Sequence, residues 1–203
     1  MFPADRIEAA AERSPLVRSA FEQAHSDHAG QVRNGSGGKP YVEHPVRVAA
    51  LLDEHGYGEE VLAAALLHDV VEDSETTLDG LRQKFGGEVA GLVGAMTDDE
   101  SIDDYRQRKA EHRERLAAAP AEALAIYGAD KLTNVSTLAA AYAEEGDAVR
   151  DEFKVPIELK LEIWDEDLAL LREKAPELPF LDRLEEEVSR LRACLEAPAP
   201  PRG

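Results

Sequence analysis

The sequence predicts an all-α fold in a single domain. Apolar residues recur at helical spacing through almost the whole chain, and residues typical of helix ends separate the segments. No stretch shows the alternation of a β-strand, no unit is repeated, and no segment has the composition of an interdomain linker. We therefore expect one helical domain over residues 1–196, followed by a short disordered tail at 197–203.

Each helix is predicted from its own start and stop residues. The first covers 14–30, with Ser14 as the N-cap and Pro15 at the first helical position. A loop at 34–40 follows, rich in glycine that tolerates left-handed backbone. Further helices are expected over 44–56, 59–73, 76–86, 87–97, 98–120, 121–146, 155–176 and 179–197, the last with an apolar stripe that packs on the protein's own core.

Composition and charge exclude several classes of protein. The chain has 203 residues, of which 43% are apolar and 32% charged, with a net charge of −19. Such an acidic surface repels phosphate backbones, so we expect no nucleic-acid or anionic-membrane partner. No run is apolar enough to cross a bilayer, the N-terminus lacks the pattern of a signal peptide, and Cys194 is the only cysteine. A reducing, cytoplasmic setting is therefore expected.

The stretch "AAALLHDVVED" combines burial with charge. On a helix, His68, Asp69, Glu72 and Asp73 fall within an arc of roughly 140°. The preceding turns are apolar on every side, so this helix should be central in the fold. Buried charges are costly unless they are paired or bound to a cation. This segment alone leaves two interpretations open, a buried salt-bridge network and a metal site.

Two further segments favour the metal site. Asp130, Asn134 and Thr137 lie at i, i+4 and i+7 and form one polar stripe on an apolar helix. His44 directly precedes Pro45, at the start of another helix. Three predicted core helices thus each contribute imidazole or carboxylate groups, which suit Mn²⁺, Fe²⁺ or Zn²⁺. The four groups are His44, His68, Asp69 and Asp130. Four protein ligands around an octahedral ion leave two positions for water and substrate.

These residues carry a resemblance to the HD superfamily of metal-dependent phosphohydrolases. Within it, the chain resembles the hydrolase domain of the RelA/SpoT alarmone enzymes, and most closely the small single-domain hydrolases typified by the animal SpoT homologue. The likeness runs from about Phe21 to Leu138. The matching pieces are "HAGQVR", "GGKPYVEHPVRVAALL", "AAALLHDVVEDSETTLDGLRQKFG", "VGAMTDD" and "ADKLTNVSTL".

The resemblance implies a helical HD-domain fold and a role for each matching residue. One Mn²⁺ per chain would be held by His44, His68, Asp69 and Asp130. The pair Glu72 and Asp73 would orient the attacking water and accept its proton. Arg33 would reach a phosphate or the base, and Asn134 and Thr137 would contact the sugar or base of the nucleotide.

The implied activity is Mn²⁺-dependent hydrolysis of guanosine 3′,5′-bis(diphosphate), or its 5′-triphosphate form, to GDP or GTP and pyrophosphate. Some departures weaken the expected phosphate site, since Asn34, Glu100 and Ser136 replace residues that are commonly basic in the family. Two alternatives therefore stay open. The enzyme would act on a related nucleotide, such as (p)ppApp or the 2′-phosphate of NADPH, or the chain would be a non-catalytic alarmone-binding regulator or antitoxin. The oligomeric state is left open.

The remaining histidines and one tyrosine are assigned structural or surface positions. His25 and His28 are expected to pack in the first predicted helix, and His55 and His112 to be exposed. Tyr41 is expected to pack in the core, and stacking on a base is the alternative interpretation. Whether Lys39, Arg47 and Lys131 replace the missing basic residues depends on where their side chains point, which the sequence does not show.

Overall fold

The computed structural model describes residues 1–34 and 36–196, and within them the fold is all-α, as predicted. The only β-type contact of the described residues is an isolated antiparallel bridge between Val32 and Pro40. The predicted tail at 197–203 lies outside the described residues. The elements are α1 (Pro3–Arg13), α2 (Pro15–Asp27), α3 (Glu43–Glu54), α4 (Glu59–Leu67), α5 (Val70–Asp73), α6 (Leu78–Met96), α7 (Tyr105–Leu116), α8 (Ala121–Glu145), the 3₁₀-helix η1 (Gly146–Glu152), α9 (Ile157–Lys174) and α10 (Leu181–Glu196).

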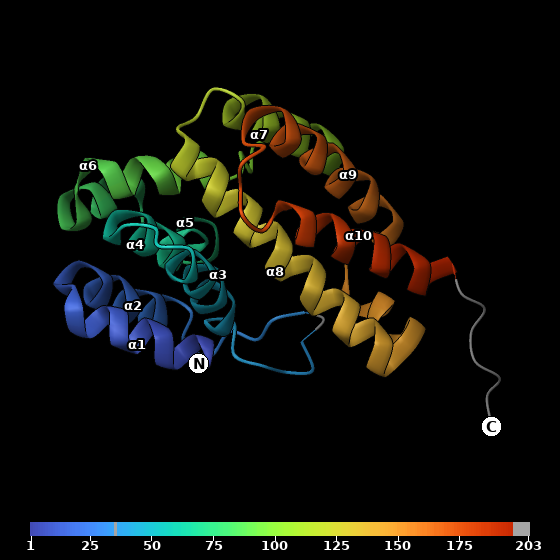
Figure 1. Ribbon diagram of the computed structural model, residues 1–203, viewed down its shortest axis with the longest axis horizontal. Helices are drawn as coiled ribbons and strands as arrows, with labels where there is room; N and C mark the ends of the chain where they lie inside the picture. The colour runs from blue at the N-terminus through green and yellow to red at the C-terminus, as the bar shows by residue number, and fades with distance from the viewer. Residues whose placement is uncertain (35, 197–203) are drawn as a thin grey trace.

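Helix α8 is the axis of the molecule (Figure 1). It packs against α3, α4 and α6 on one side and against α9 and α10 on the other. One cluster of buried apolar side chains extends from Ile7 in α1 to Leu191 in α10. The predicted apolar stripe of the last helix is confirmed, because Leu184, Val188 and Leu191 are all buried there. Within the described part of the chain, no helix has both the length and the apolarity that a membrane span requires.

The structure differs from the predicted helices at several ends. The prediction of one helix over 59–73 is wrong, because α4 ends at Leu67 and α5 begins at Val70. The amide groups of Glu72 and Asp73 both donate to the Asp69 carbonyl, at 3.1 and 3.0 Å, and so start a new turn after the break. Helix α1 was not predicted as an element of its own.

Two other predicted segments also have different helix boundaries in the structure, and each difference has a local cause. The helices expected over 76–86 and 87–97 join in α6 across a kink at Gly86, whose φ of 89° is open to glycine at little cost. The segment 98–120 is helical only in α7, from Tyr105 to Leu116. Helix α7 starts there because the Asp104 carboxylate accepts a hydrogen bond from the Gln107 amide, at 2.8 Å.

Candidate metal centre and adjoining pocket

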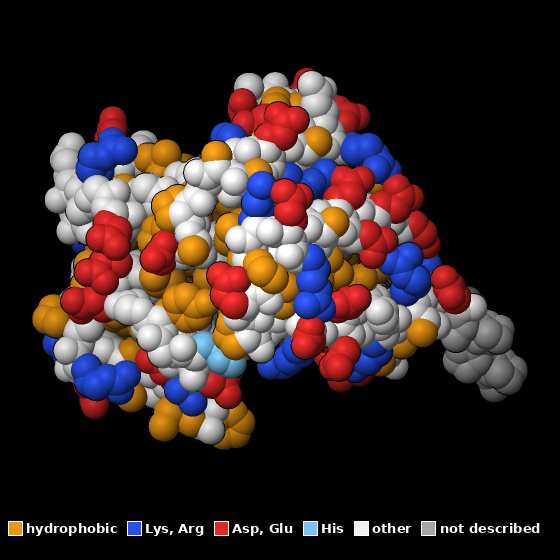
Figure 2. Space-filling view, turned by 45° about the horizontal axis from the view of Figure 1, so that its top comes forward, with side chains coloured by type: hydrophobic (Ala, Val, Ile, Leu, Met, Phe, Trp, Pro, Cys, Tyr) orange, Lys and Arg blue, Asp and Glu red, His pale blue; other side chains and the backbone are white. Residues whose placement is uncertain are grey.

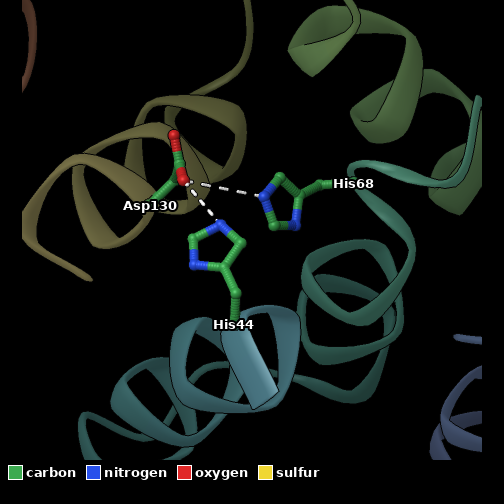
Figure 3. Close-up of side chains that lie close together, drawn as sticks. All are labelled: His44, His68 and Asp130. Atoms are coloured by element: carbon green, nitrogen blue, oxygen red, sulfur yellow. Dashed lines mark ion pairs between the residues drawn. The ribbon is translucent and has the colours of Figure 1, made fainter. Parts of the chain in front are cut away.

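Three segments bring two imidazoles and a carboxylate together. His44 lies in the first turn of α3, His68 directly after α4, and Asp130 on α8, and Figure 3 shows their side chains pointing toward one another. The Asp130 Oδ1 atom is 3.0 Å from His44 Nε2 and 3.7 Å from His68 Nε2. Asp69 Oδ1 lies 3.2 Å from His68 Nε2. The four residues predicted as metal ligands thus converge on one place in the core.

Hydrogen bonds around this cluster orient its members. The Nδ1–H group of His68 donates to the Ala65 carbonyl at 2.8 Å, which turns Nε2 toward the carboxylates. The Tyr41 hydroxyl donates to Asp69 Oδ2 at 2.8 Å. Lys131 Nζ donates to Asp130 Oδ2 at 2.9 Å. Such outer contacts are what orient the ligands of a metal site.

The donor set fits a divalent cation. The His68 Nε2 atom is buried and has no hydrogen-bond partner among the described residues, although it faces two carboxylates. One ligand atom each from His44, His68 and Asp130 lies within 4.8 Å of the others, close enough to hold one metal ion. Mixed imidazole and carboxylate ligands are typical of Mn²⁺, Fe²⁺ and Zn²⁺ sites.

The charges of the cluster also favour a bound cation. Burial opposes ionisation of His68, but the carboxylates of Asp69 and Asp130 outweigh it and raise the pKa of the imidazole to about 9. Burial, assisted by Arg33, lowers the pKa of His44 to about 4. The buried carboxylates therefore draw positive charge into this part of the core, and a metal ion supplies it without protonating a ligand.

The predicted pair Glu72 and Asp73 occupies two different environments in α5. Glu72 is half-buried, and its Oε1 atom accepts a hydrogen bond from the Asp98 amide at 2.6 Å. Burial, followed by the neighbouring Asp69 charge, raises the pKa of Glu72 to about 7. Asp73 is more exposed, and its pKa is raised by the same two causes. Glu72 is therefore the carboxylate of the pair that is better suited to exchange protons near neutral pH.

The Asp98 side chain anchors the segment that holds Glu72. It lies 2.6 Å from Lys109 Nζ, 2.9 Å from His112 Nδ1 and 3.4 Å from Arg108 Nε, all on α7. The prediction that His112 is exposed is wrong, because it is 2% exposed and its other ring nitrogen lies 2.8 Å from the Ala95 carbonyl oxygen. His112 lies in a highly charged stretch of sequence, and for this reason the sequence predicted an exposed side chain.

A pocket of about 280 Å³ adjoins the metal centre, and the three predicted substrate-binding residues line it. The Arg33 guanidinium donates to the Asn134 side-chain oxygen, and the Asn134 amide donates to Asp130 Oδ1 at 2.6 Å. Thr137 lies on the same wall. Asn134 therefore connects the pocket wall on α8 to the predicted metal ligand Asp130.

Several residues that line this pocket were not predicted from the sequence as pocket residues. Phe153, Lys160 and Trp164 line the pocket from the segment after α8 and from α9. Burial, followed by the nearby lysines, lowers the pKa of Lys160 to about 8. Tyr41, expected in the core, is half-buried, lines the pocket and binds Asp69. Only the Lys160 and Trp164 spacing of i, i+4 hinted that these two residues share a face of their helix.

The other histidines and Lys131 are placed by their contacts. His28 is buried and stacks on Tyr41 with ring centroids 4.7 Å apart, which supports the expected structural role. His55 is exposed as predicted, and His25 is also exposed, with its ring in edge-to-face contact with Phe21. Lys131 is buried against Asp130, with Nζ 4.3 Å from the Tyr127 ring centroid, so it does not reach the pocket as a free cation.

Comparison with known proteins identifies the family to which the chain is similar. The model of a family described as "HD domain" matches residues 20–155. A guanosine-3′,5′-bis(diphosphate) 3′-pyrophosphohydrolase of Aquifex aeolicus is 34% identical over 154 residues, which are 73% of this chain and 22% of that protein. The mouse enzyme of the same description, MESH1, is 38% identical over 129 residues, covering 63% of this chain and 71% of the mouse protein. The chain thus spans about a fifth of its bacterial relative and most of the animal one.

A solved structure shows the same arrangement of helices. It is described as a metazoan ortholog of SpoT that hydrolyzes ppGpp and plays a role in starvation responses. It matches with a TM-score of 0.72 at 29% identity, over 90% of this chain and 98% of that one. A Listeria monocytogenes crystal structure matches with a TM-score of 0.66 at 34% identity, over 72% of this chain and 96% of that one.

Proposed function

The chain belongs to the HD domain family, and we propose that it is a metal-dependent hydrolase that removes the 3′-pyrophosphate of guanosine 3′,5′-bis(diphosphate). One observation carries the proposal: the cluster of His44, His68 and Asp130, with Asp69, lies between Glu72 on one side and a pocket of about 280 Å³ on the other. The printed descriptions of the Aquifex, mouse and metazoan relatives support this choice of substrate.

The proposed cofactor is one Mn²⁺, held by His44, His68, Asp69 and Asp130. A bound divalent ion lowers the pKa of water and stabilises the charge that develops on a phosphoryl group. Lys131 and Tyr41 occupy the outer oxygens of Asp130 and Asp69, so each carboxylate keeps its other oxygen toward the imidazoles. Manganese is preferred here on the resemblance described above, and the donor set also suits iron and zinc.

The side chains have distinct tasks in the proposed reaction. Water attacks the phosphorus attached to the 3′-oxygen, the bond between them breaks, and the nucleoside 5′-diphosphate and pyrophosphate separate. Glu72, with its pKa raised to about 7, accepts the proton of the attacking water, while Asp73 helps to orient that water. Arg33 and Lys160 supply positive charge to the phosphates, and Asn134 and Thr137 bind the sugar or base.

The setting of this reaction is proposed to be the cytoplasm. The substrate is a small nucleotide, and Cys194 is a free thiol in the structure, consistent with a reducing compartment. The acidic surface, with a net charge of −19, makes a small anion that is gathered into a local basic pocket a more favourable ligand than a nucleic acid.

Product analysis tests the proposal directly. Purified protein is stripped of metal, reloaded separately with Mn²⁺, Fe²⁺, Zn²⁺ or Mg²⁺, and incubated with guanosine 3′,5′-bis(diphosphate). We expect GDP and pyrophosphate in equal amounts with Mn²⁺ and no product from the stripped protein. Parallel reactions with (p)ppApp and NADPH identify the substrate with the highest kcat/KM. Tight binding of the guanosine nucleotide with no product under any metal would overturn the enzymatic proposal in favour of a binding protein.

A further inference from the structure

Some basic side chains of the described residues form no ion pair with a carboxylate. The chain has 42 acidic and 23 basic residues, and Figure 2 shows Lys and Arg interspersed among Asp and Glu on one face. Most basic side chains of the described residues pair with a carboxylate. Arg33, Lys39, Arg47 and Lys160 make no such ion pair with any residue that the structure describes, yet all four line hollows along α8. Arg33 and Lys160 belong to the proposed pocket, which leaves Lys39 and Arg47 unassigned.

Arg47 lies beside Thr137, the residue that two of these hollows share. It follows His44 by one turn of α3, and its NH1 group donates to the Thr137 hydroxyl at 3.3 Å. Thr137 lines the pocket of about 280 Å³ and also a second hollow of about 230 Å³, whose other walls include Lys39 and Arg47. A third hollow of about 210 Å³ on the other side of Arg47 contains Arg6 and Arg183.

Ser136 adds an unused hydrogen-bonding group at the same place. Its hydroxyl oxygen is buried and has no hydrogen-bond partner in the described part of the chain. Ser136 lines both hollows that contain Arg47. A buried hydroxyl usually has a partner, so one that borders a hollow next to a guanidinium without an ion pair is arranged for an anionic group.

We propose that Arg47, together with Lys39 and Ser136, binds the 5′-phosphates of the nucleotide whose 3′-pyrophosphate is removed. This inference rests on the proposed function. A bis(diphosphate) carries charge at both ends, and the metal centre and Glu72 serve only the 3′ end. Glu144 and Glu145 line the far edge of the Lys39 hollow, so the phosphates are expected on the α3 side, against Arg47.

The test compares substrates that differ only at the 5′ end. KM and kcat are measured for guanosine 3′,5′-bis(diphosphate) and for guanosine 3′-diphosphate with a free 5′-hydroxyl. We expect Arg47→Met to raise KM roughly tenfold for the first substrate, as befits the loss of one charge-assisted contact, with kcat unchanged. KM for the 5′-hydroxyl substrate should not change. Arg82→Met on α6, whose partner is the exposed Asp79, removes the same charge elsewhere and serves as the matched control.

A rescue separates binding from a structural role. The double variant Arg47→Met/Ser136→Arg returns a guanidinium to the same hollows, and we expect it to restore most of the KM for the 5′-phosphorylated substrate. An equal rise in KM for both substrates, or no rise, overturns the inference while leaving the proposed function intact. If the wild-type protein hydrolyses neither substrate with any metal, the proposed function fails first, and this inference fails with it.

Discussion

At the scale of single residues, the fold gives two adjacent carboxylates different properties. Glu72 turns into the protein and accepts the Asp98 amide, whereas Asp73 stays more open to solvent. Burial favours the neutral acid, so the pKa of Glu72 rises to about 7 while its side chain keeps a fixed position. A carboxylate in this state accepts a proton readily at neutral pH and releases it again after each turnover.

Replacing Glu72 tests this assignment. We expect Glu72→Gln to lower kcat by roughly 10²- to 10⁴-fold, because the amide keeps the shape but cannot accept the proton of water. Metal binding, measured by elemental analysis and by calorimetric titration with Mn²⁺, should match the wild type. Glu75→Gln, an exposed neighbour in the same acidic stretch, is the control and should keep full activity. A Glu72→Gln variant with near-normal kcat would assign the proton transfer to Asp73 instead.

Residue types and spacing were enough to predict that the imidazoles and carboxylates of the candidate metal site lie together, but not which residues complete the pocket. His68 and Asp130 stood out because ionisable groups interrupt apolar helices, and His44 because it begins a helix directly before a proline. Lys160 and Trp164 lie on a helix whose sequence mixes charge and apolar residues on several faces. Which face meets the pocket depends on how α9 crosses α8, and this crossing is a property of the packed fold rather than of the local sequence.

At the scale of elements, α7 acts as a brace for the segment between α6 and α7. Asp98 is nearly buried against Lys109, His112 and Arg108, and Arg115 donates to the Thr97 carbonyl at 2.8 Å. Burial opposes ionisation of Asp98, but the nearby His112 imidazole and Lys109 ammonium group outweigh it and hold its pKa well below the usual value. The brace therefore supports Glu72 through the Asp98 amide.

The lowered pKa of Asp98 predicts how the free energy of unfolding depends on pH. The Asp98 carboxylate contributes stability at every pH above its unfolded pKa of about 3.9, and this contribution is lost as pH falls through the lower folded pKa. Asp98→Asn should lower the free energy of unfolding by about 2 kcal/mol at pH 7, since it replaces a charged hydrogen-bond acceptor. The difference from the wild type, measured by urea unfolding, should shrink steadily below about pH 4.

The activity of the Asp98→Asn variant tests whether the contacts between Asp98 and α7 support Glu72. We expect Asp98→Asn to lower kcat and leave KM unchanged, because only the support of Glu72 is weakened. Asp103→Asn, at an exposed position just before α7, changes the charge equally and should alter neither stability nor kcat. A stability difference that is constant from pH 7 to pH 3 would show that the Asp98 charge is not what anchors this segment.

The break between α4 and α5 shows why element boundaries were harder to predict than elements. Residues 59–73 have helical spacing and no glycine or proline, so the sequence predicts one continuous helix. In the fold, His68 and Asp69 instead lie at a break where their side chains meet groups from α3 and α8. Tertiary contacts at the metal centre thus override a local preference.

At the scale of the whole molecule, α8 joins the metal centre to the C-terminal helices. Asp130 lies on the side of α8 that meets α3, while Gly128 lies where the segment entering α10 crosses α8. A Cβ atom at Gly128 would be 3.1 Å from a Phe180 ring carbon and 3.3 Å from a Leu178 methyl group. The segment that leads into α10 therefore leaves little room for a side chain at this position, and α10 in turn packs against α9, which carries Lys160 and Trp164.

This close approach predicts opposite effects for two glycine substitutions. Gly128→Ala should lower the free energy of unfolding by about 1–3 kcal/mol through overpacking, even though alanine is the better helix former. Gly91→Ala in α6 is the matched control: its Cβ would meet nothing within 4 Å, so we expect a gain of about 0.5–1 kcal/mol. Because α10 supports α9, Gly128→Ala should also raise KM. Phe180→Leu in the same chain should recover part of both losses by making room for the added methyl group. Equal stabilisation by both alanines would show that α10 does not need the close approach to hold α9 at the pocket.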